Sequence, residues 1–222
     1  MKKFQPKLIK IVAAGLVIAI LGIVYAYRAY APGLNGPANV DSADSTSITS
    51  VVDRGLEPED EARVRGTIAG LEQTVADNEA NDARDISLIL GLANLYYQVG
   101  ELETAATWYK DILRTHPNDP PALENLGQAQ LEMGDYAGAR TSWEAAANVE
   151  ALEMNYLRLA DLIARHFPED RSEIRSILEV GIANLGQTPG LLVALGNWYE
   201  SKGMLDEAIS HYEVARTLSP KD

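Results

Sequence analysis

The chain has 222 residues, no cysteine, and 32 acidic against 19 basic side chains. The absence of cysteine excludes disulfides, thiolate metal sites, a cysteine nucleophile and a lipid anchor on cysteine. Residues 1–31 contain five basic residues and no acidic one, so the remaining residues hold 14 basic and 32 acidic side chains, a net charge of −18. Because so acidic a region repels phosphate backbones, nucleic acid is not expected as a partner.

The N-terminal residues are typical of a membrane anchor. Residues 11–27 form a run of 17 residues without a charge, and the long side chains of Lys10 and Arg28 can reach the membrane surface on either side. A helix over residues 8–30 has 23 residues, which at about 1.5 Å per residue crosses a hydrocarbon core of about 30 Å. We therefore predict one transmembrane helix at residues 8–30, preceded by a basic cytoplasmic tail at residues 1–7.

The residues around this helix predict its orientation. Lysines precede the span and an acidic region comes after it, which places the N-terminus inside and the rest of the chain outside. Tyr25, Tyr27 and Tyr30 lie where an interfacial aromatic belt is expected. The layout is similar to that of bacterial proteins with one N-terminal span and an exported domain. We expect a single-pass protein of the cell (inner) membrane with its folded part in the periplasm.

An alternative interpretation is a cleaved signal peptide that releases a soluble exported protein. Ala29-Tyr30-Ala31 has the form of an Ala-x-Ala cleavage site. Pro32 directly after the cut and Arg28 close before it are both unusual at such a site. The uncleaved anchor is therefore the favoured interpretation.

Residues 31–58 have the composition of a flexible linker. The segment is rich in Gly, Pro, Ser, Asn and Asp and has no helical period, so it cannot bury enough apolar surface to offset the entropy lost on ordering. As a coil of 27 residues, residues 32–58 span about 30 Å. Asp41 and Asp44 lack the spacing of a calcium loop.

A first amphipathic helix is predicted over residues 59–80. Its first turn is acidic, which complements the positive end of the helix dipole. One apolar stripe comes next at helical spacing, formed by Val64, Ile68, Leu71 and Val75. Because it lacks the repeat pattern found downstream, we interpret it as an N-terminal capping helix.

The remaining sequence repeats itself. Three positions of the first unit recur 34 residues later and again 69 residues after that: Leu92, Ala105 and Tyr109, then Leu126, Ala139 and Trp143, then Leu195, Ala208 and Tyr212. Within the first unit, small residues at Ala93 and Ala105 allow two helices to pack closely. Gly100 ends the first of these helices and Pro117 ends the second.

These recurring residues resemble the tetratricopeptide repeat over residues 86–221. The resemblance implies an all-α fold, a right-handed superhelical solenoid of about four helical hairpins that comes after the capping helix and the transmembrane helix. The hairpins are expected at residues 86–119, 120–152, 153–187 and 188–222. The third diverges, because it lacks the turn glycine and has a longer corner with Pro168 at a helix start.

The resemblance also implies a concave groove, lined by the first helix of each hairpin, for a protein or peptide partner. The expected lining residues are Leu90, Asn94, Tyr97, Gln98, Glu124, Asn125, Gln128, Glu132, Leu157, Arg158, Asp161, Arg165, Val193, Asn197 and Glu200.

Some members of the family hold a C-terminal carboxylate with two lysines, two asparagines and an arginine. Asn94 and Asn125 match the asparagine positions, and Arg158 lies near the arginine position. Leu90 and Met154 stand where the lysines should be. Carboxylate recognition of that kind is therefore not expected, and the mixed lining favours an extended or helical peptide.

No enzyme activity, cofactor or metal site is expected. The three histidines, His116, His166 and His211, have no metal-ligand spacing. No glycine-rich phosphate loop follows a strand, and the tryptophans are explained by packing. The interpretation is a membrane-anchored scaffold or adaptor for the assembly or chaperoning of a membrane or exported complex. The alternative is a structural subunit held permanently in a large membrane complex.

The last hairpin is expected to lack a polar capping helix. Ile209, Val214 and Leu218 would then be partly exposed on its outer side. Two interpretations remain open: the face is covered by its own long side chains, or a partner or second copy docks there and forms a homo-oligomer.

Overall fold

A computed structural model of the chain describes residues 51–219. The helices are α2 (Pro58–Ala80), α3 (Ile86–Gln98), α4 (Leu102–Thr115), α5 (Pro120–Glu132), α6 (Tyr136–Val149), α7 (Glu153–His166), the 3-10 turn η1 (Pro168–Asp170), α8 (Glu173–Leu185), α9 (Pro189–Ser201) and α10 (Leu205–Leu218). Apart from an isolated bridge between Val51 and Glu101, residues 51–219 form no β-structure. The all-α architecture expected from the repeat pattern is confirmed for this part of the chain.

The predicted membrane segment cannot be compared with the structure. The basic tail at residues 1–7, the helix at residues 8–30 and the linker as far as residue 50 all lie outside the described residues. Between residues 51 and 219, no helix is both long enough and apolar enough to cross a membrane. Helices α2 to α10 all belong to one compact unit.

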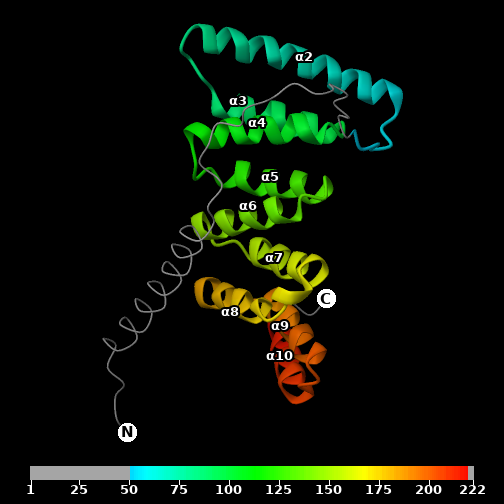
Figure 1. Cartoon of the computed structure of the whole chain (residues 1–222), viewed down its shortest axis with the longest axis vertical. Coiled ribbons are helices and arrows are strands. Elements are labelled where there is room, and N and C mark those ends of the chain that lie inside the picture. The colour runs from blue at the N-terminus through cyan, green and yellow to red at the C-terminus, as the bar shows by residue number, and fades with distance from the viewer. Residues whose placement is uncertain (1–50, 220–222) are drawn as a thin grey trace, which may run out of the picture. The chain divides into compact units, whose positions relative to one another are not determined.

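Each helix of this unit packs on the next one along the chain, as Figure 1 shows. Helices α3 and α4, α5 and α6, α7 and α8, and α9 and α10 form the four hairpins, and α2 packs against α3. The first helices of neighbouring hairpins also touch, α3 with α5 and α7 with α9. These contacts bring the expected groove residues of consecutive hairpins together.

Three hairpins turn at a glycine in the left-handed conformation. Gly100, Gly134 and Gly203 have φ of +83°, +79° and +73°, values that are strained for residues with a Cβ atom. The third hairpin has no such glycine. There Pro168 begins the 3-10 turn η1, and α8 starts only at Glu173.

In the second and fourth hairpins, an aromatic ring lies directly on a glycine of the first helix. A Cβ atom added at Gly127 would stand 2.5 Å from the indole of Trp143, and one at Gly196 would stand 2.4 Å from the ring of Tyr212. Both separations are far below van der Waals contact. The glycines therefore set the distance between the two helices.

The third hairpin reverses this arrangement. Its small residue, Gly181, is on the second helix, where an added Cβ would stand 3.0 Å from the ring of Tyr156 on the first helix. The Tyr156 hydroxyl accepts a hydrogen bond of 2.8 Å from Nδ2 of Asn184. The divergent unit thus keeps a small residue under an aromatic ring, although the helices that supply them are exchanged.

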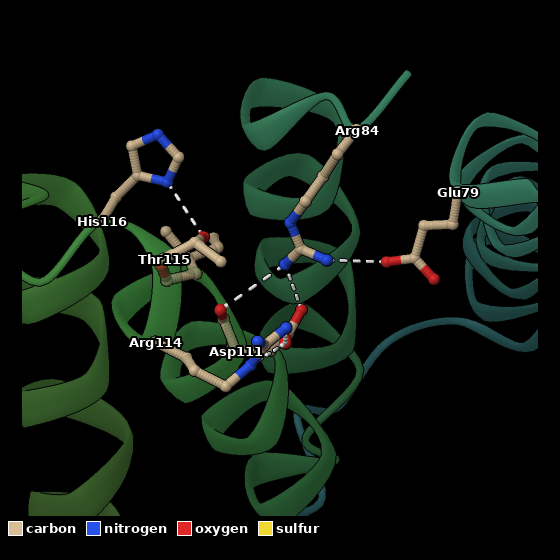
Figure 2. A network of polar contacts seen from close by, with 7 residues as sticks. Glu79, Arg84, Asp111, Arg114, Thr115 and His116 are labelled. Carbon is tan, nitrogen blue, oxygen red and sulfur yellow. Dashed lines mark hydrogen bonds and ion pairs between the residues drawn. The ribbon is translucent and has the colours of Figure 1, made fainter. Parts of the chain in front are cut away.

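An ion-pair network joins the end of α2 to the first hairpin. Figure 2 shows Arg84, from the connection before α3, between Glu79 of α2 and Asp111 of α4. Its guanidinium lies 2.7 Å from Glu79 and also binds the Asp111 carboxylate, which Arg114 contacts at 3.1 Å. Burial alone would raise the pKa of Asp111, but the hydrogen bonds from Arg84 and Arg114 outweigh it and lower that pKa. The network holds the capping helix in place.

Gly127→Ala should destabilise the protein. The added methyl group must displace the buried indole of Trp143, and such overpacking costs about 1–3 kcal/mol. The better helix propensity of alanine offsets at most about 1 kcal/mol of this. Gly66→Ala in α2 is the matched control, because nothing lies within 4 Å of its added Cβ. Chemical denaturation should show a lower free energy of unfolding for Gly127→Ala and an unchanged or higher one for Gly66→Ala. Equal effects would contradict the close approach.

Asp111→Asn should lower stability in a pH-dependent way. The folded-state pKa of Asp111 is depressed, so its contribution is present above the pKa of the unfolded chain and is lost as pH falls through the folded value. The free energy of unfolding at pH 7 should fall by about 1–2 kcal/mol, and the difference from the unmodified chain should shrink towards pH 3. Asp161→Asn removes an exposed pair with Arg165 and should cost no more than about 0.5 kcal/mol. A deficit independent of pH would refute the ionic origin.

Candidate functional site

The expected groove residues of the first two hairpins lie together. Nδ2 of Asn125 on α5 donates a hydrogen bond of 3.0 Å to Oδ1 of Asn94 on α3. The same oxygen accepts a bond of 2.7 Å from the hydroxyl of Tyr109, which comes from the second helix of the hairpin. The two asparagines singled out in the sequence are thus neighbours, and a core tyrosine fixes the orientation of one of them.

The fourth hairpin repeats this arrangement. The Tyr212 hydroxyl lies 2.7 Å from Oδ1 of Asn197, the residue equivalent to Asn94, and 2.8 Å from Glu200. Burial first, and then the bond to Glu200, raise the pKa of Tyr212. Within residues 51–219 the amide NH₂ groups of Asn94 and Asn197 donate no hydrogen bond. Each amide is therefore held by its oxygen, and both residues are exposed.

A second polar cluster lies at the C-terminal ends of α3 and α5. The Tyr97 hydroxyl and Nε2 of Gln128 both donate to Oε1 of Glu132, the latter over 2.9 Å. Burial and the bond to Glu132 raise the pKa of Tyr97. For Glu132, burial acts in the opposite direction from the bonds donated by Tyr97, Gln128 and Arg54, and the bonds prevail, so that its pKa is lowered. Glu132 is therefore a carboxylate at neutral pH.

Arg54 completes this cluster, and the sequence did not indicate it. Its guanidinium lies 2.8 Å from Oε2 of Glu132 and 4.6 Å from the centre of the Tyr97 ring. The predicted flexible linker at residues 31–58 included Arg54. From Val51 onward, however, the backbone packs on the first hairpin, where Val52 N–H donates to the carbonyl of Gly100 over 3.0 Å. Composition could not show this, because the contact depends on backbone pairing and one charge rather than on apolar residues.

The second half of the groove is open. A cavity of about 420 Å³ between α7, α8 and α9 is lined by Leu157, Asp161 and Asn197, all expected from the sequence, and by Arg171, Trp198 and Lys202, which were not expected. Lys202 lies 5.7 Å from the centre of the Trp198 ring. The cavity offers an aromatic surface beside charges of both signs.

Of the other predicted lining residues, Leu90, Glu124 and Arg158 are engaged in contacts, whereas Gln98 is exposed. Leu90 packs against the core, and Gln98 is exposed at the end of α3. The Glu124 carboxylate accepts a bond of 3.0 Å from the fully buried Asn155. The Arg158 guanidinium lies 5.7 Å from the centre of the Trp143 ring.

Arg165 and Val193 are two further exposed positions of the expected groove, and each histidine contacts a residue outside the two polar clusters. Arg165 pairs with Asp161 at 2.8 Å, and Val193 is exposed. His116 contacts Thr115, His166 stacks on Tyr136 and His211 stacks on Tyr199. In the part of the chain that the structure describes, no three His, Cys, Asp or Glu side chains are grouped so that they could hold a metal ion.

On α10, two of the three apolar residues that we predicted to be partly exposed are indeed exposed. Ile209 and Leu218 are 54% and 46% exposed, and Val214 is half-buried. That a partner or second copy docks there stays a prediction.

Gly100→Ala should release residues 51–56 from the first hairpin. An added Cβ there would stand 1.8 Å from the carbonyl oxygen of Val52, whereas nothing lies within 4 Å of one at Gly134. Both substitutions carry the same left-handed backbone strain, so Gly134→Ala is the matched control. In Gly100→Ala alone, hydrogen exchange at the Val52 amide should accelerate by about tenfold or more, and trypsin should cleave after Arg54. An equal response from both variants would mean that strain at the turn, rather than docking of the segment, is responsible.

Comparisons with known proteins identify the repeats. Models of the tetratricopeptide repeat match residues 86–129, 120–145 and 191–222. A comparison with curated proteins found no match.

Among solved structures, a crystal structure of MamA is 18% identical, covers 73% of this chain and 94% of its own, and has a TM-score of 0.56. A second MamA crystal structure is 19% identical, covers 70% and 85%, and has a TM-score of 0.54. The crystal structure of YrrB, described as a TPR protein with an unusual peptide-binding site, is 20% identical, covers 68% and 75%, and has a TM-score of 0.52. At these identities the likeness concerns the fold alone. Residues 86–145 and 191–222 are therefore tetratricopeptide repeats within an all-α solenoid.

Proposed function

We propose that the chain is a membrane-anchored adaptor that binds an extended segment of a partner protein along the first helices of its repeats. The observation that carries this proposal is the pair of equivalent asparagines, Asn94 and Asn197, whose oxygens are held by core tyrosines. Fixed amide donors of this kind suit the backbone carbonyls of an extended peptide. They provide binding without requiring a particular partner side chain at those positions.

The open cavity in the second half of the groove supports the same proposal. Leu157 and Trp198 supply apolar surface for partner side chains, and Asp161, Arg171 and Lys202 supply charges at its edge. A volume of about 420 Å³ accommodates one or two side chains of a peptide. YrrB, which shares the fold, is described as having a peptide-binding site, and this description adds to the case for a peptide ligand.

The membrane part of the proposal rests on the sequence. Residues 8–30 have the length and apolarity of a spanning helix, and the basic residues before them favour a cytoplasmic N-terminus. The repeats would then act in the periplasm, and the residues between the anchor and Val51 would hold the groove close to the membrane. Assembly or chaperoning of a membrane or exported complex fits this position.

A second candidate function is that of a permanent subunit of a membrane complex. Leu205 and Ile209, one turn apart on the same side of α10, are 59% and 54% exposed. Large apolar residues gathered on one terminal helix are typical of a lasting interface. Under this alternative the partner binds α10, while the groove residues stay free.

Site-specific photocrosslinking in intact membranes distinguishes these candidates. A photoreactive residue at Gln98 or Asp161 lies on the groove side, whereas one at Lys110 or Thr141 lies on exposed positions of the second helices. One at Ile209 reports on α10. We expect the same partner protein to be captured from Gln98 and Asp161, and not from Lys110 or Thr141. Asn197→Ala should reduce capture roughly three- to tenfold through the loss of a hydrogen bond.

The matched control for that variant is Asn148→Ala, which removes an exposed amide from α6 and should leave capture unchanged. Capture of the partner only from Ile209 would favour the permanent-subunit alternative. Labelling only through Lys110 and Thr141 would refute the groove assignment. Recovery of the chain in the soluble fraction instead of the membrane pellet would contradict the anchored part of the proposal.

A further inference from the structure

We propose that the groove contains an arginine-binding subsite, formed by Tyr97 and Glu132, that the chain's own Arg54 occupies. A partner would bind there through an arginine in an extended segment that displaces residues 51–56. This inference rests on the proposed peptide-binding function and specifies both the chemistry of the partner and the competitor that it must displace.

The subsite makes three kinds of contact with a guanidinium. Nη2 of Arg54 lies 2.8 Å from Oε2 of Glu132 and donates to the backbone carbonyl of Tyr97 over 3.3 Å. The guanidinium carbon lies 4.6 Å from the centre of the Tyr97 ring, which is cation–π distance. A planar cation that stacks and donates several hydrogen bonds uses all of these contacts, whereas a lysine ammonium matches fewer of them. The geometry therefore favours arginine.

The Glu132 carboxylate, which accepts the guanidinium, is held in position by residues other than Arg54. The Tyr97 hydroxyl and Gln128 both donate to the other carboxylate oxygen of Glu132. These bonds fix the carboxylate and leave Oε2 directed at the guanidinium. Both members of the ion pair are partly buried, with side-chain exposures of 24% for Arg54 and 22% for Glu132. If the segment left, the Tyr97 hydroxyl and Gln128 would still hold the Glu132 carboxylate in place, ready to pair with another guanidinium.

Residues 51–56 are bound in the way that a peptide ligand would be. Val52 N–H pairs with the carbonyl of Gly100, and Val51 forms an isolated antiparallel bridge with Glu101. Leu56 packs against the core cluster that contains Ile68. Backbone pairing, an apolar anchor and one charged side chain are the elements of extended-peptide recognition. The segment thus shows how a partner of similar sequence would lie.

The contact is special to the first hairpin. Gly134 and Gly203 make the equivalent turns in other hairpins, and each has open space where Gly100 meets Val52. Position 132 holds a glutamate, while its equivalents in the first and fourth hairpins are Gln98 and Ser201. The solenoid therefore offers this particular combination of turn, ring and carboxylate once within the described repeats.

Residues 51–56 can be displaced because the hydrogen bonding of Arg54 in the subsite is incomplete. Nε of Arg54 is buried and has no hydrogen-bond partner within residues 51–219. Such a buried donor carries a desolvation cost that a better-placed arginine would avoid. The competitor is nonetheless effective, since a segment on the same chain is present at a local concentration of the order of millimolar. Only a partner with several further contacts along the groove would displace residues 51–56 from the subsite. The segment would therefore exclude weakly binding ligands.

A synthetic peptide with the sequence of residues 51–57, VVDRGLE, labelled with a fluorophore, tests the subsite in trans. It is titrated against the purified full chain, in detergent, in four forms: unmodified, Arg54→Ala, Arg54→Ala with Glu132→Gln, and Arg63→Ala. Arg63 is the matched control, because it is an exposed arginine on α2 whose one ion pair within residues 51–219 is with the neighbouring Asp60. Fluorescence anisotropy gives the dissociation constants.

We expect the peptide to bind Arg54→Ala at least about tenfold more tightly than the unmodified chain or Arg63→Ala. Adding Glu132→Gln should abolish this gain, and a peptide with alanine in place of its arginine should not bind any form. Hydrogen exchange at Val52 in the unmodified chain gives a second readout that needs no substitution, since a saturating concentration of peptide should accelerate it. Equal affinity for Arg54→Ala and the unmodified chain, or no effect of peptide on exchange at Val52, would overturn the inference.

The test separates this inference from the proposed function. If a partner crosslinks from Gln98 and Asp161 but the peptide does not distinguish Arg54→Ala from the unmodified chain, the groove function stands and the arginine subsite is wrong. If the peptide binds as expected but groove crosslinks are not found, the subsite stands as an intramolecular clamp and the adaptor function is wrong.

Discussion

The close approach of an aromatic ring to a residue with almost no side chain is the contact on which the rest of this structure depends. Trp143 lies on Gly127 and Tyr212 lies on Gly196, at distances that leave no room for a Cβ atom. Because protein interiors are close-packed, this contact sets the separation of the two helices in the second and fourth hairpins. The contact also fixes the position of the polar atom of each ring, the Tyr212 hydroxyl or the Trp143 N–H, and therefore the groups to which that atom can donate a hydrogen bond.

The groove inherits its chemistry from this packing. The hydroxyls of Tyr109 and Tyr212 pass between the helices and hold the oxygens of Asn94 and Asn197. In the second hairpin the ring is an indole, whose N–H donates instead to the carbonyl of Glu124 over 3.1 Å. The identity of a buried aromatic residue therefore determines whether the groove at that level presents a fixed amide. The packing between helices and the proposed groove are therefore not independent in this fold.

The divergent third hairpin keeps the contact between an aromatic ring and a small residue, although it lacks the repeat pattern of the other hairpins. It has no turn glycine, and its second helix starts late, yet Tyr156 and Gly181 restore a small residue under a ring with the helices exchanged. It is joined to the hairpin before it through Asn155, which is fully buried and donates to Glu124. The array continues through this unit, and the open cavity lies against its first helix. The part of the chain after residue 31 also has a net charge of −18. Its electrostatic field therefore favours a cationic ligand over an anionic one.

The sequence by itself determined the architecture of the repeats. The resemblance to the tetratricopeptide repeat implied that Asn94 and Asn125 line the same groove, whereas their hydrogen bond is a finding of the structure. A period of 34 residues, with small and aromatic residues at constant offsets, predicted the helices, because helices are regular elements with a constant spacing. The reversed packing of Tyr156 and Gly181 was not predicted, since it breaks that spacing. Only the tertiary structure decided which groove residues are open. Leu90 and Glu124 are engaged in packing, whereas Trp198 and Lys202 line the cavity. It also decided that Arg54 lies on Tyr97, 43 residues further along the chain. A periodic pattern indicates which residues share a face of a helix. Arg54 lies in a segment without such a pattern, so its contact with Tyr97 depends on how the folded helices are arranged.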